Sequence, residues 1–161
     1  VFMCPSDPYN GVYSSGGLAT DLATTSYLGC RGSERYPAAG NGIFPERNVS
    51  IRFRDVTDGT SNTIAVGERT VEGNQQTPWW AAAAGYDGHG LGDQVLDSQD
   101  GIFFGTPGSV NVDARHWWSM HIGGGQFMLG DGSVRFVSEN LDHQTLLKLS
   151  DCQDGEVIGE F

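Results

Sequence analysis

The chain has 161 residues, 38% of them hydrophobic, and a formal net charge of −11. This length fits one domain with a sizeable buried core. Nine lysines and arginines against 20 aspartates and glutamates exclude the basic surface that nucleic-acid binding needs, so no nucleic acid is expected among its partners. The 24 glycines, about twice the average usage, predict many turns between short elements.

The first 42 residues predict little regular structure. Residues 1–3 begin as a short apolar edge strand, which ends at Pro5 and Pro8 because proline cannot donate a hydrogen bond to a sheet ladder. Residues 9–42 combine Gly, Ser, Thr and Ala without hydrophobic periodicity. We therefore interpret them as mostly loop, with one short strand over residues 26–29.

Two strands and a long insertion are predicted for the middle of the chain. Residues 49–54 alternate apolar and polar side chains, as a strand with one buried face does. After a run of turn-forming residues, residues 63–69 return to β-favouring types. Residues 70–112 are rich in Gly and Asp and predict a long loop region, which in compact domains is usually functional.

The last quarter of the chain gives the clearest prediction. Apolar runs on both sides of an Asp-Gly pair predict a β-hairpin over residues 126–137. Asn140 is expected to cap a helix over residues 141–149, and residues 156–161 are expected to form a closing strand. The predicted fold is α+β: a single domain over residues 1–161 with an antiparallel sheet, long Gly-rich loops and a short carboxy-terminal helix.

The three cysteines, Cys4, Cys30 and Cys152, share no Cys-x-x-Cys spacing, which removes the usual zinc and thioredoxin signatures. An odd number allows one disulfide at most. In an exported protein the preferred pair is Cys4 with Cys30, because it closes the shorter loop. Three reduced, buried cysteines are an equally good interpretation.

His121 and Asp131 are expected to have a structural role. The imidazole can donate to the Asp131 carboxylate, or to a backbone carbonyl beside the glycines, and so hold the hairpin to the preceding loop. Metal binding by this pair is not expected, because one His and one Asp fall short of the four ligands that zinc prefers. Ser119 adds the third residue type of a catalytic triad but has no Gly-x-Ser-x-Gly elbow around it, so no enzyme is expected.

Two Asp-rich turns, residues 55–59 and 97–101, offer oxygen ligands of the kind that calcium binds. Neither has the alternating Asp spacing of an EF-hand. Asp, Ser and Asn side chains commonly bond to their own backbone in turns, and this is the favoured interpretation. No cofactor is expected other than calcium, which stays open.

Trp79, Trp80 and Tyr86 lie in the long loop region and are candidate ligand or interface aromatics. Exposed aromatic rings stack on sugars or become buried at protein interfaces. Packing in the core is an equally good interpretation of these side chains. Asn48 begins an Asn-x-Ser glycosylation sequon, a triplet that often goes unused.

Five sequence blocks resemble a known family when they are taken together. They are Cys4-Pro5-Ser6-Asp7, residues 41–44, residues 55–69, His121 followed after nine residues by Asp131-Gly132, and residues 155–161. In this order they resemble a large family of bacterial prepilin-like proteins of unknown function, named for its carboxy-terminal His-x9-Asp-Gly motif. Family members carry a prepilin-type signal and a long hydrophobic helix before the Cys-Pro-Ser-Asp block, and the present sequence begins close to that block.

The resemblance implies a pilin-like head whose sheet packs on the hydrophobic helix. It also implies a noncatalytic, exported structural subunit of an extracellular fibre or pseudopilus, found outside the cell or on its surface. The implied partners are copies of the same chain and components of a secretion or pilus machine. The alternative is a carbohydrate-binding surface module whose loop aromatics contact glycans.

Overall fold

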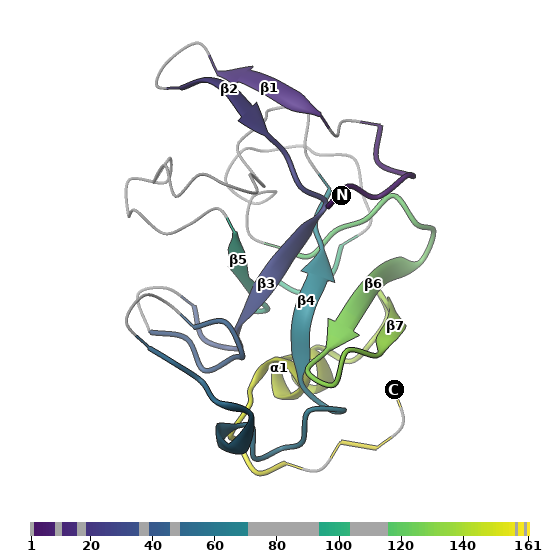
Figure 1. Ribbon diagram of the computed structural model, residues 1–161. Helices are drawn as coiled ribbons and strands as arrows, with labels where there is room; N and C mark the ends of the chain where they lie inside the picture. The colour runs from purple at the N-terminus through teal and green to yellow at the C-terminus, as the bar shows by residue number, and fades with distance from the viewer. Residues whose placement is uncertain are drawn as a thin grey trace.

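The computed structural model describes residues 2–8, 11–15, 19–35, 39–45, 49–70, 94–103, 116–156, 158, 159 and 161 (Figure 1). The elements of this described part, in chain order, are β1 (Val12–Ser15), β2 (Ala19–Ala23), β3 (Tyr27–Gly32), the 3-10 helix η1 (Phe53–Asp55), β4 (Ile64–Glu68), β5 (Val95–Asp97), β6 (Gly124–Leu129), β7 (Val134–Ser138) and α1 (His143–Ser150). None of the described helices is long and apolar enough to cross a membrane.

A five-stranded sheet forms the centre of the fold, with the strand order β5-β3-β4-β6-β7. Neighbouring strands pair antiparallel except β3 and β5, which pair parallel. The strands β1 and β2 form a separate antiparallel pair, seen at the top of Figure 1. With the short helix α1, this arrangement confirms an α+β fold whose sheet is mostly antiparallel.

The sheet has two faces, which we call the core face and the groove face. Residues directly opposite each other on antiparallel strands share a face. The pair Ile64 and Leu129 belongs to the core face, whereas the pair Val66 and Met128 belongs to the groove face, together with Val134 opposite Met128. An irregularity in the register between Ile64 and Val66 allows these two residues of β4 to face opposite sides.

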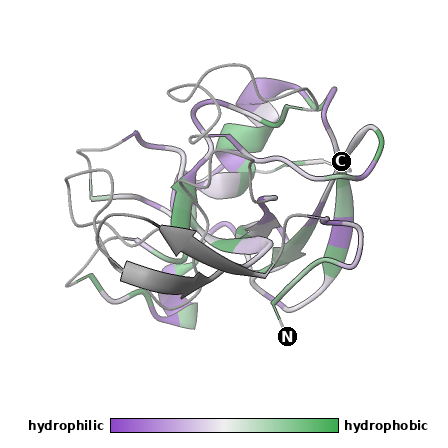
Figure 2. Cartoon of the chain, turned by 90° about the horizontal axis from the view of Figure 1, so that it is seen from above, coloured by the Kyte–Doolittle hydropathy of each residue, from purple (hydrophilic) through white to green (hydrophobic). Residues whose placement is uncertain are grey.

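The helix α1 covers the core face and contacts β3 and β4. Its residues Leu146 and Leu149 are buried, and in Figure 2 the helix shows both apolar (green) and polar (purple) segments, as a helix with one buried side does. The cluster of buried core residues consists of Leu28, Cys30, Ile64, Leu96, Trp117, Phe127, Leu129, Val137, Leu146 and Leu149. Gly67 makes room for this packing, because a Cβ atom there would lie 2.5 Å from the Phe127 ring and 2.8 Å from the Trp117 ring.

The helix begins two residues later than the sequence predicts. Asp142 Oδ2 accepts hydrogen bonds from Thr145 N at 2.9 Å and from Thr145 Oγ1 at 3.1 Å, so Asp142 is the capping residue. Asn140 belongs to the preceding turn, where its backbone N–H donates to Ser138 Oγ at 3.1 Å. Asn and Asp are equally good caps in isolation, and the turn that follows β7 decides between them.

The strands β6 and β7 form the predicted hairpin. Gly132 has φ +85° in its turn, a conformation that glycine adopts without strain, and its N–H donates to Leu129 O at 2.9 Å. Asp131 Oδ1 accepts from Ser133 N at 2.8 Å and from Ser133 Oγ at 2.7 Å, which closes the turn locally. The Asp-Gly signal in the sequence is therefore confirmed.

The strand predicted over residues 49–54 is wrong. Residues 49–52 have no regular structure, and η1 follows them. Asp55 Oδ2 accepts a hydrogen bond from Arg52 N at 2.9 Å and tightens the chain into a turn. Phe53 is 82% exposed instead of buried, so the alternation of apolar and polar residues did not reflect a buried face.

Other strands were missed or placed wrongly. The prediction over residues 26–29 is confirmed and extends to Gly32 in β3, but β1 and β2 fold from residues interpreted as loop. The strand β5 lies within the predicted insertion and has three residues, too few to show a period of two. The described residues of the predicted terminal strands, at positions 2, 3, 156, 158, 159 and 161, belong to no strand.

Candidate functional site

Three side chains from distant parts of the chain meet at one point. His121 Nε2 lies 3.5 Å from Cys4 Sγ and 3.2 Å from Glu68 Oε1. One nitrogen, sulfur or oxygen atom from each residue lies within 4.8 Å of the other two. We call this the Cys-Glu-His cluster. Each member comes from a different block of the family resemblance.

The amino-terminal segment brings Cys4 to the cluster. Cys4 N donates to Ser26 Oγ at 2.9 Å, and Ser26 Oγ in turn donates to Asp7 Oδ2 at 3.1 Å. Asp7 N donates back to Cys4 O at 3.0 Å, so the Cys-Pro-Ser-Asp block is a closed turn. Ser26 directly precedes β3, and these bonds therefore tie the turn to the sheet.

Glu68 is the last residue of β4, and its side chain is 2% exposed. Its Oε2 atom accepts a hydrogen bond of 2.6 Å from Gln126 N on β6. This bond directs the other oxygen, Oε1, towards His121. The position of Glu68 opposite Tyr27 places the carboxylate on the groove face of the sheet.

His121 is held by a tight loop that leads into β6. Its backbone N–H donates to Ser119 Oγ at 2.9 Å, and Ser119 Oγ donates to Gly124 O at 2.6 Å. The Ser119 hydroxyl therefore bonds to backbone groups and shapes the loop. The grouping of Ser119, His121 and Asp131 into a catalytic triad receives no support from this geometry.

The two ends of the His-x9-Asp-Gly motif lie at opposite ends of β6. His121 precedes the strand, and Asp131 follows it in the hairpin turn. Hydrogen bonds from Ser133 lower the pKa of the Asp131 carboxyl below its ordinary value. Of the two partners expected for the His121 ring, the Asp131 carboxylate is wrong, because β6 separates the two side chains.

The arrangement of the cluster differs from a cysteine catalytic triad. In such triads the nucleophile and the acid contact different ring nitrogens of the histidine. Here Cys4 and Glu68 both contact Nε2. Burial and the neighbouring Glu68 raise the pKa of the Cys4 thiol, whereas a nucleophilic cysteine needs a lowered pKa.

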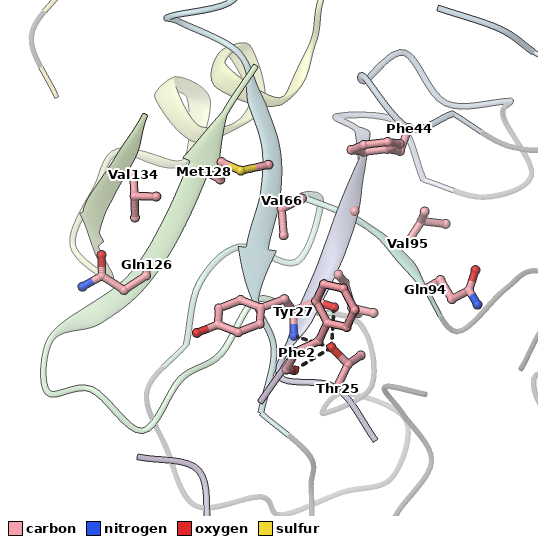
Figure 3. A pocket seen from close by; sticks show the side chains of 12 residues that line it. Phe2, Thr25, Tyr27, Phe44, Val66, Gln94, Val95, Gln126, Met128 and Val134 are labelled. Carbon is pink, nitrogen blue, oxygen red and sulfur yellow. Dashed lines mark hydrogen bonds between the residues drawn. The ribbon is translucent and has the colours of Figure 1, made fainter. Parts of the chain in front are cut away.

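An apolar groove of about 690 Å³ lies on the groove face (Figure 3). Its lining consists of Phe2, Thr25, Tyr27, Leu28, Gly29, Phe44, Val66, Gln94, Val95, Gln126, Met128 and Val134. Tyr27 lies between the groove and the cluster. Burial, together with the neighbouring Cys4 and Glu68, raises the pKa of Tyr27 to about 12. A groove of this size and character suits an apolar partner.

Residues 1–144 match the model of a family described as "Protein of unknown function (DUF1559)". The chain belongs to this family. No curated protein and no solved structure matches the chain.

The predicted Cys4–Cys30 disulfide is absent from this DUF1559 chain, in which none of the three cysteines is bonded to another. Cys30 belongs to the core cluster, whereas Cys4 lies beside Tyr27 and Glu68 on the groove-face side. The sheet therefore separates the two thiols. Burial raises the pKa of Cys30 and of Cys152 to about 11 each, which keeps both thiols protonated at neutral pH.

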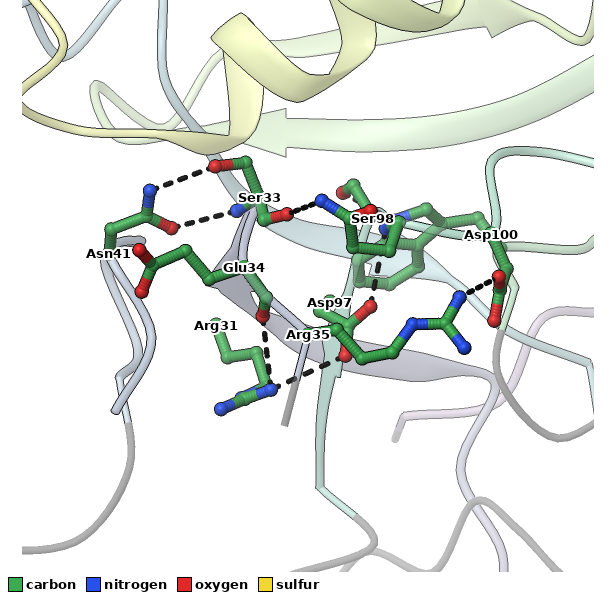
Figure 4. Close-up of polar contacts among 10 residues, drawn as sticks. Arg31, Ser33, Glu34, Arg35, Asn41, Asp97, Ser98 and Asp100 are labelled. Atoms are coloured by element: carbon green, nitrogen blue, oxygen red, sulfur yellow. Dashed lines mark hydrogen bonds and ion pairs between the residues drawn. The ribbon is translucent and has the colours of Figure 1, made fainter. Parts of the chain in front are cut away.

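The Asp-rich turns of the DUF1559 chain use their carboxylates in hydrogen bonds and ion pairs. Asp58 accepts from Asp154 N at 2.8 Å and from Gly155 N at 2.9 Å. In the second turn, Arg31 pairs with Asp97 at 3.3 Å and Arg35 pairs with Asp100 (Figure 4). These contacts are those expected of turn-stabilising side chains, and calcium binding stays a prediction.

The remaining sequence candidates lie outside the described residues. These are the sequon residue Asn48 and the loop aromatics Trp79, Trp80 and Tyr86. Their predicted roles in glycosylation and in glycan or protein contacts stay predictions.

Sequence reasoning missed Glu68 as a site residue, because nothing in residues 63–69 distinguishes it from an ordinary strand residue. Its position within a family block was the one available signal.

Proposed function

We propose that this chain is a noncatalytic, exported structural subunit of an extracellular fibre or pseudopilus, in which the groove face packs on an apolar helix. The observation that carries the proposal is the apolar groove on one face of the central sheet. A sheet with one solvated face normally alternates apolar and polar residues, with the polar ones outward. Here the outward residues that line the groove are largely apolar.

The exposure of these residues supports an interaction surface. Val134 is 62% exposed, Phe2 is 53% exposed and Met128 is 36% exposed. Single exposed apolar residues are common, but a contiguous set around one groove marks a binding surface on a soluble domain. Figure 3 shows Val66, Met128 and Val134 presented from adjacent strands along this surface.

The proposed occupant is the hydrophobic helix that members of the resembling family carry before the Cys-Pro-Ser-Asp block. The segment that contains this block already lines the groove through Phe2. Phe2 O accepts hydrogen bonds from Ser26 N at 2.8 Å and from Thr25 Oγ1 at 2.9 Å. These bonds hold the amino-terminal segment against the residues that lead into β3. A helix joined to this segment reaches the groove without crossing the sheet, and ridges of its side chains fill an apolar surface of this kind.

Electron microscopy of cells that produce the full-length gene product tests the proposal. An antibody raised against the present domain should label extracellular fibres. The substitutions Met128→Lys and Val134→Lys place charges in the groove at positions already exposed in the domain, so they should abolish fibre assembly while leaving the melting temperature of the isolated domain within a few degrees of the wild type.

Phe53→Lys is the matched control, because Phe53 is exposed and lies outside the groove lining. It should leave assembly intact. Absence of labelled fibres from wild-type cells, or normal fibres from both groove variants, would reject the proposed function.

A further inference from the structure

The Cys-Glu-His cluster combines three chemically different metal-ligand atoms around one point. We propose that it binds one divalent transition-metal ion of the Zn²⁺ class, which joins the amino-terminal segment to the sheet. A thiolate sulfur, an imidazole nitrogen and a carboxylate oxygen form a ligand set that suits zinc, whereas calcium and magnesium favour oxygen alone. This inference does not depend on the proposed fibre.

The two separations from His121 Nε2 fit a common metal centre, and the third pair of ligand atoms lies within 4.8 Å. With Zn–S of about 2.3 Å and Zn–N and Zn–O of about 2.0–2.1 Å, tetrahedral angles place a sulfur about 3.5 Å from a nitrogen and an oxygen about 3.3 Å from a nitrogen. The observed separations from His121 Nε2 are 3.5 Å to Cys4 Sγ and 3.2 Å to Glu68 Oε1. The same ring nitrogen thus faces both other ligands, as it would when all three atoms surround one ion.

Burial and charge also favour a cation at this point. The side chain of Glu68 is 2% exposed and Cys4 is 5% exposed, and a buried carboxylate needs a partner of opposite charge. On metal binding the Cys4 thiol releases its proton to solvent, and the thiolate and the carboxylate together carry two negative charges. One divalent ion neutralises both, with neutral His121 as the third ligand.

The cluster has ligand support and an entry path. The hydrogen bond from Gln126 N fixes the orientation of the Glu68 carboxylate, and the bond from Cys4 N to Ser26 Oγ anchors the residue that supplies the sulfur. Contacts of this kind orient ligands in known metal sites. His121 is 31% exposed, so solvent reaches the cluster from this side, and the proposal takes water from solvent as the fourth ligand.

Metal titration of the purified 161-residue chain tests the inference. After treatment with a chelator and its removal, calorimetry with Zn²⁺ should show one ion bound per chain, and the melting temperature should rise on Zn²⁺ addition. Co²⁺ used as a spectroscopic probe should give a thiolate-to-cobalt charge-transfer band in the near ultraviolet. Cys4→Ser should abolish this band, and Cys4→Ser, Glu68→Gln and His121→Gln should each weaken Zn²⁺ binding by at least about a hundredfold.

Cys152→Ser and His143→Gln are matched controls, because they remove the same residue types outside the cluster. They should keep the wild-type stoichiometry, affinity and cobalt band. Circular dichroism of each variant establishes whether it is folded. Cys4→Ser is nearly isosteric, so it should keep the fold even if one of the other variants does not. Lack of Zn²⁺ binding by the folded wild type, or equal binding by folded Cys4→Ser, would overturn the inference.

Discussion

The two faces of the central sheet differ in how much of their side chains is exposed to solvent. On the core face, which α1 covers, Ile64 and Leu129 are completely buried. On the groove face, the neighbouring residues Val66 and Met128 are only half-buried or exposed, and no described segment covers them as α1 covers the core. Both faces are nevertheless apolar.

Apolar residues on the two faces of this sheet therefore have different roles. The core face stabilises the fold by removing side chains from water, at about 25 cal/mol per Å². The groove face contributes less to folding because its residues keep contact with solvent. Exposed apolar side chains grouped in this way are typical of a surface that is buried when another segment or molecule binds.

The largest expected effect comes from the core face. Leu149 is 0% exposed, and Leu149→Ala should lower the free energy of unfolding by about 2–5 kcal/mol, since it removes buried methyl groups and leaves a cavity. Urea denaturation measures this change. Leu147→Ala, on the half-buried side of the same helix, is the control and should cost less than half as much; equal losses would contradict the assignment of α1 to the core.

Alkaline pH should weaken the core face through Cys30. Burial raises the pKa of this thiol from its usual 9.0 to about 11, so the folded state favours the protonated thiol. The stability that this preference gives to the fold is fully present below pH 9 and is lost as the pH rises through 11. Across this transition the free energy of unfolding should fall by about 3 kcal/mol. Urea denaturation at several pH values should show a steeper decline in the wild type than in Cys30→Ala, and parallel declines would show that Cys30 does not titrate in this way.

The smallest effect is expected on the groove face, where β7 offers a matched pair. Val134 is 62% exposed and Val137 is 2% exposed on the same strand. Val134→Ala should change the free energy of unfolding by less than about 0.5 kcal/mol. Val137→Ala should cost roughly 1.5–3 kcal/mol from lost burial and the resulting cavity. Comparable losses in the two variants would erase the distinction between the faces.

The hairpin shows what local sequence can predict. An Asp-Gly pair between apolar runs leaves few alternatives to a tight turn, because glycine tolerates the positive φ that Gly132 adopts. Residues 49–54 show the opposite case. Their alternation matched a strand, yet a hydrogen bond between Arg52 N and Asp55 Oδ2 formed a local turn instead.

The candidate site was only partly accessible to sequence reasoning. The motif singles out His121, but spacing alone offers as partners of its ring only Asp131, ten residues away, or a backbone carbonyl beside the glycines. The actual contacts are with Cys4, 117 positions away, and with Glu68, 53 positions away. No periodicity or spacing rule connects such distant residues. The ordered blocks that contain these residues carry the family resemblance, but they do not indicate that the blocks contact one another in the fold.

By itself, the sequence indicated membership of a family of unknown function through its ordered blocks. It also determined the α+β class, the hairpin and the approximate position of the helix, because turn chemistry, capping and hydrophobic periodicity act over a few residues. Tertiary structure decided which residues share a face and which distant side chains meet. The irregular register of β4 turns Val66 to the groove face, and strand pairing brings Glu68 to the backbone of Gln126. Such outcomes depend on long-range pairing and burial, so the groove and the Cys-Glu-His cluster exist only in the folded chain.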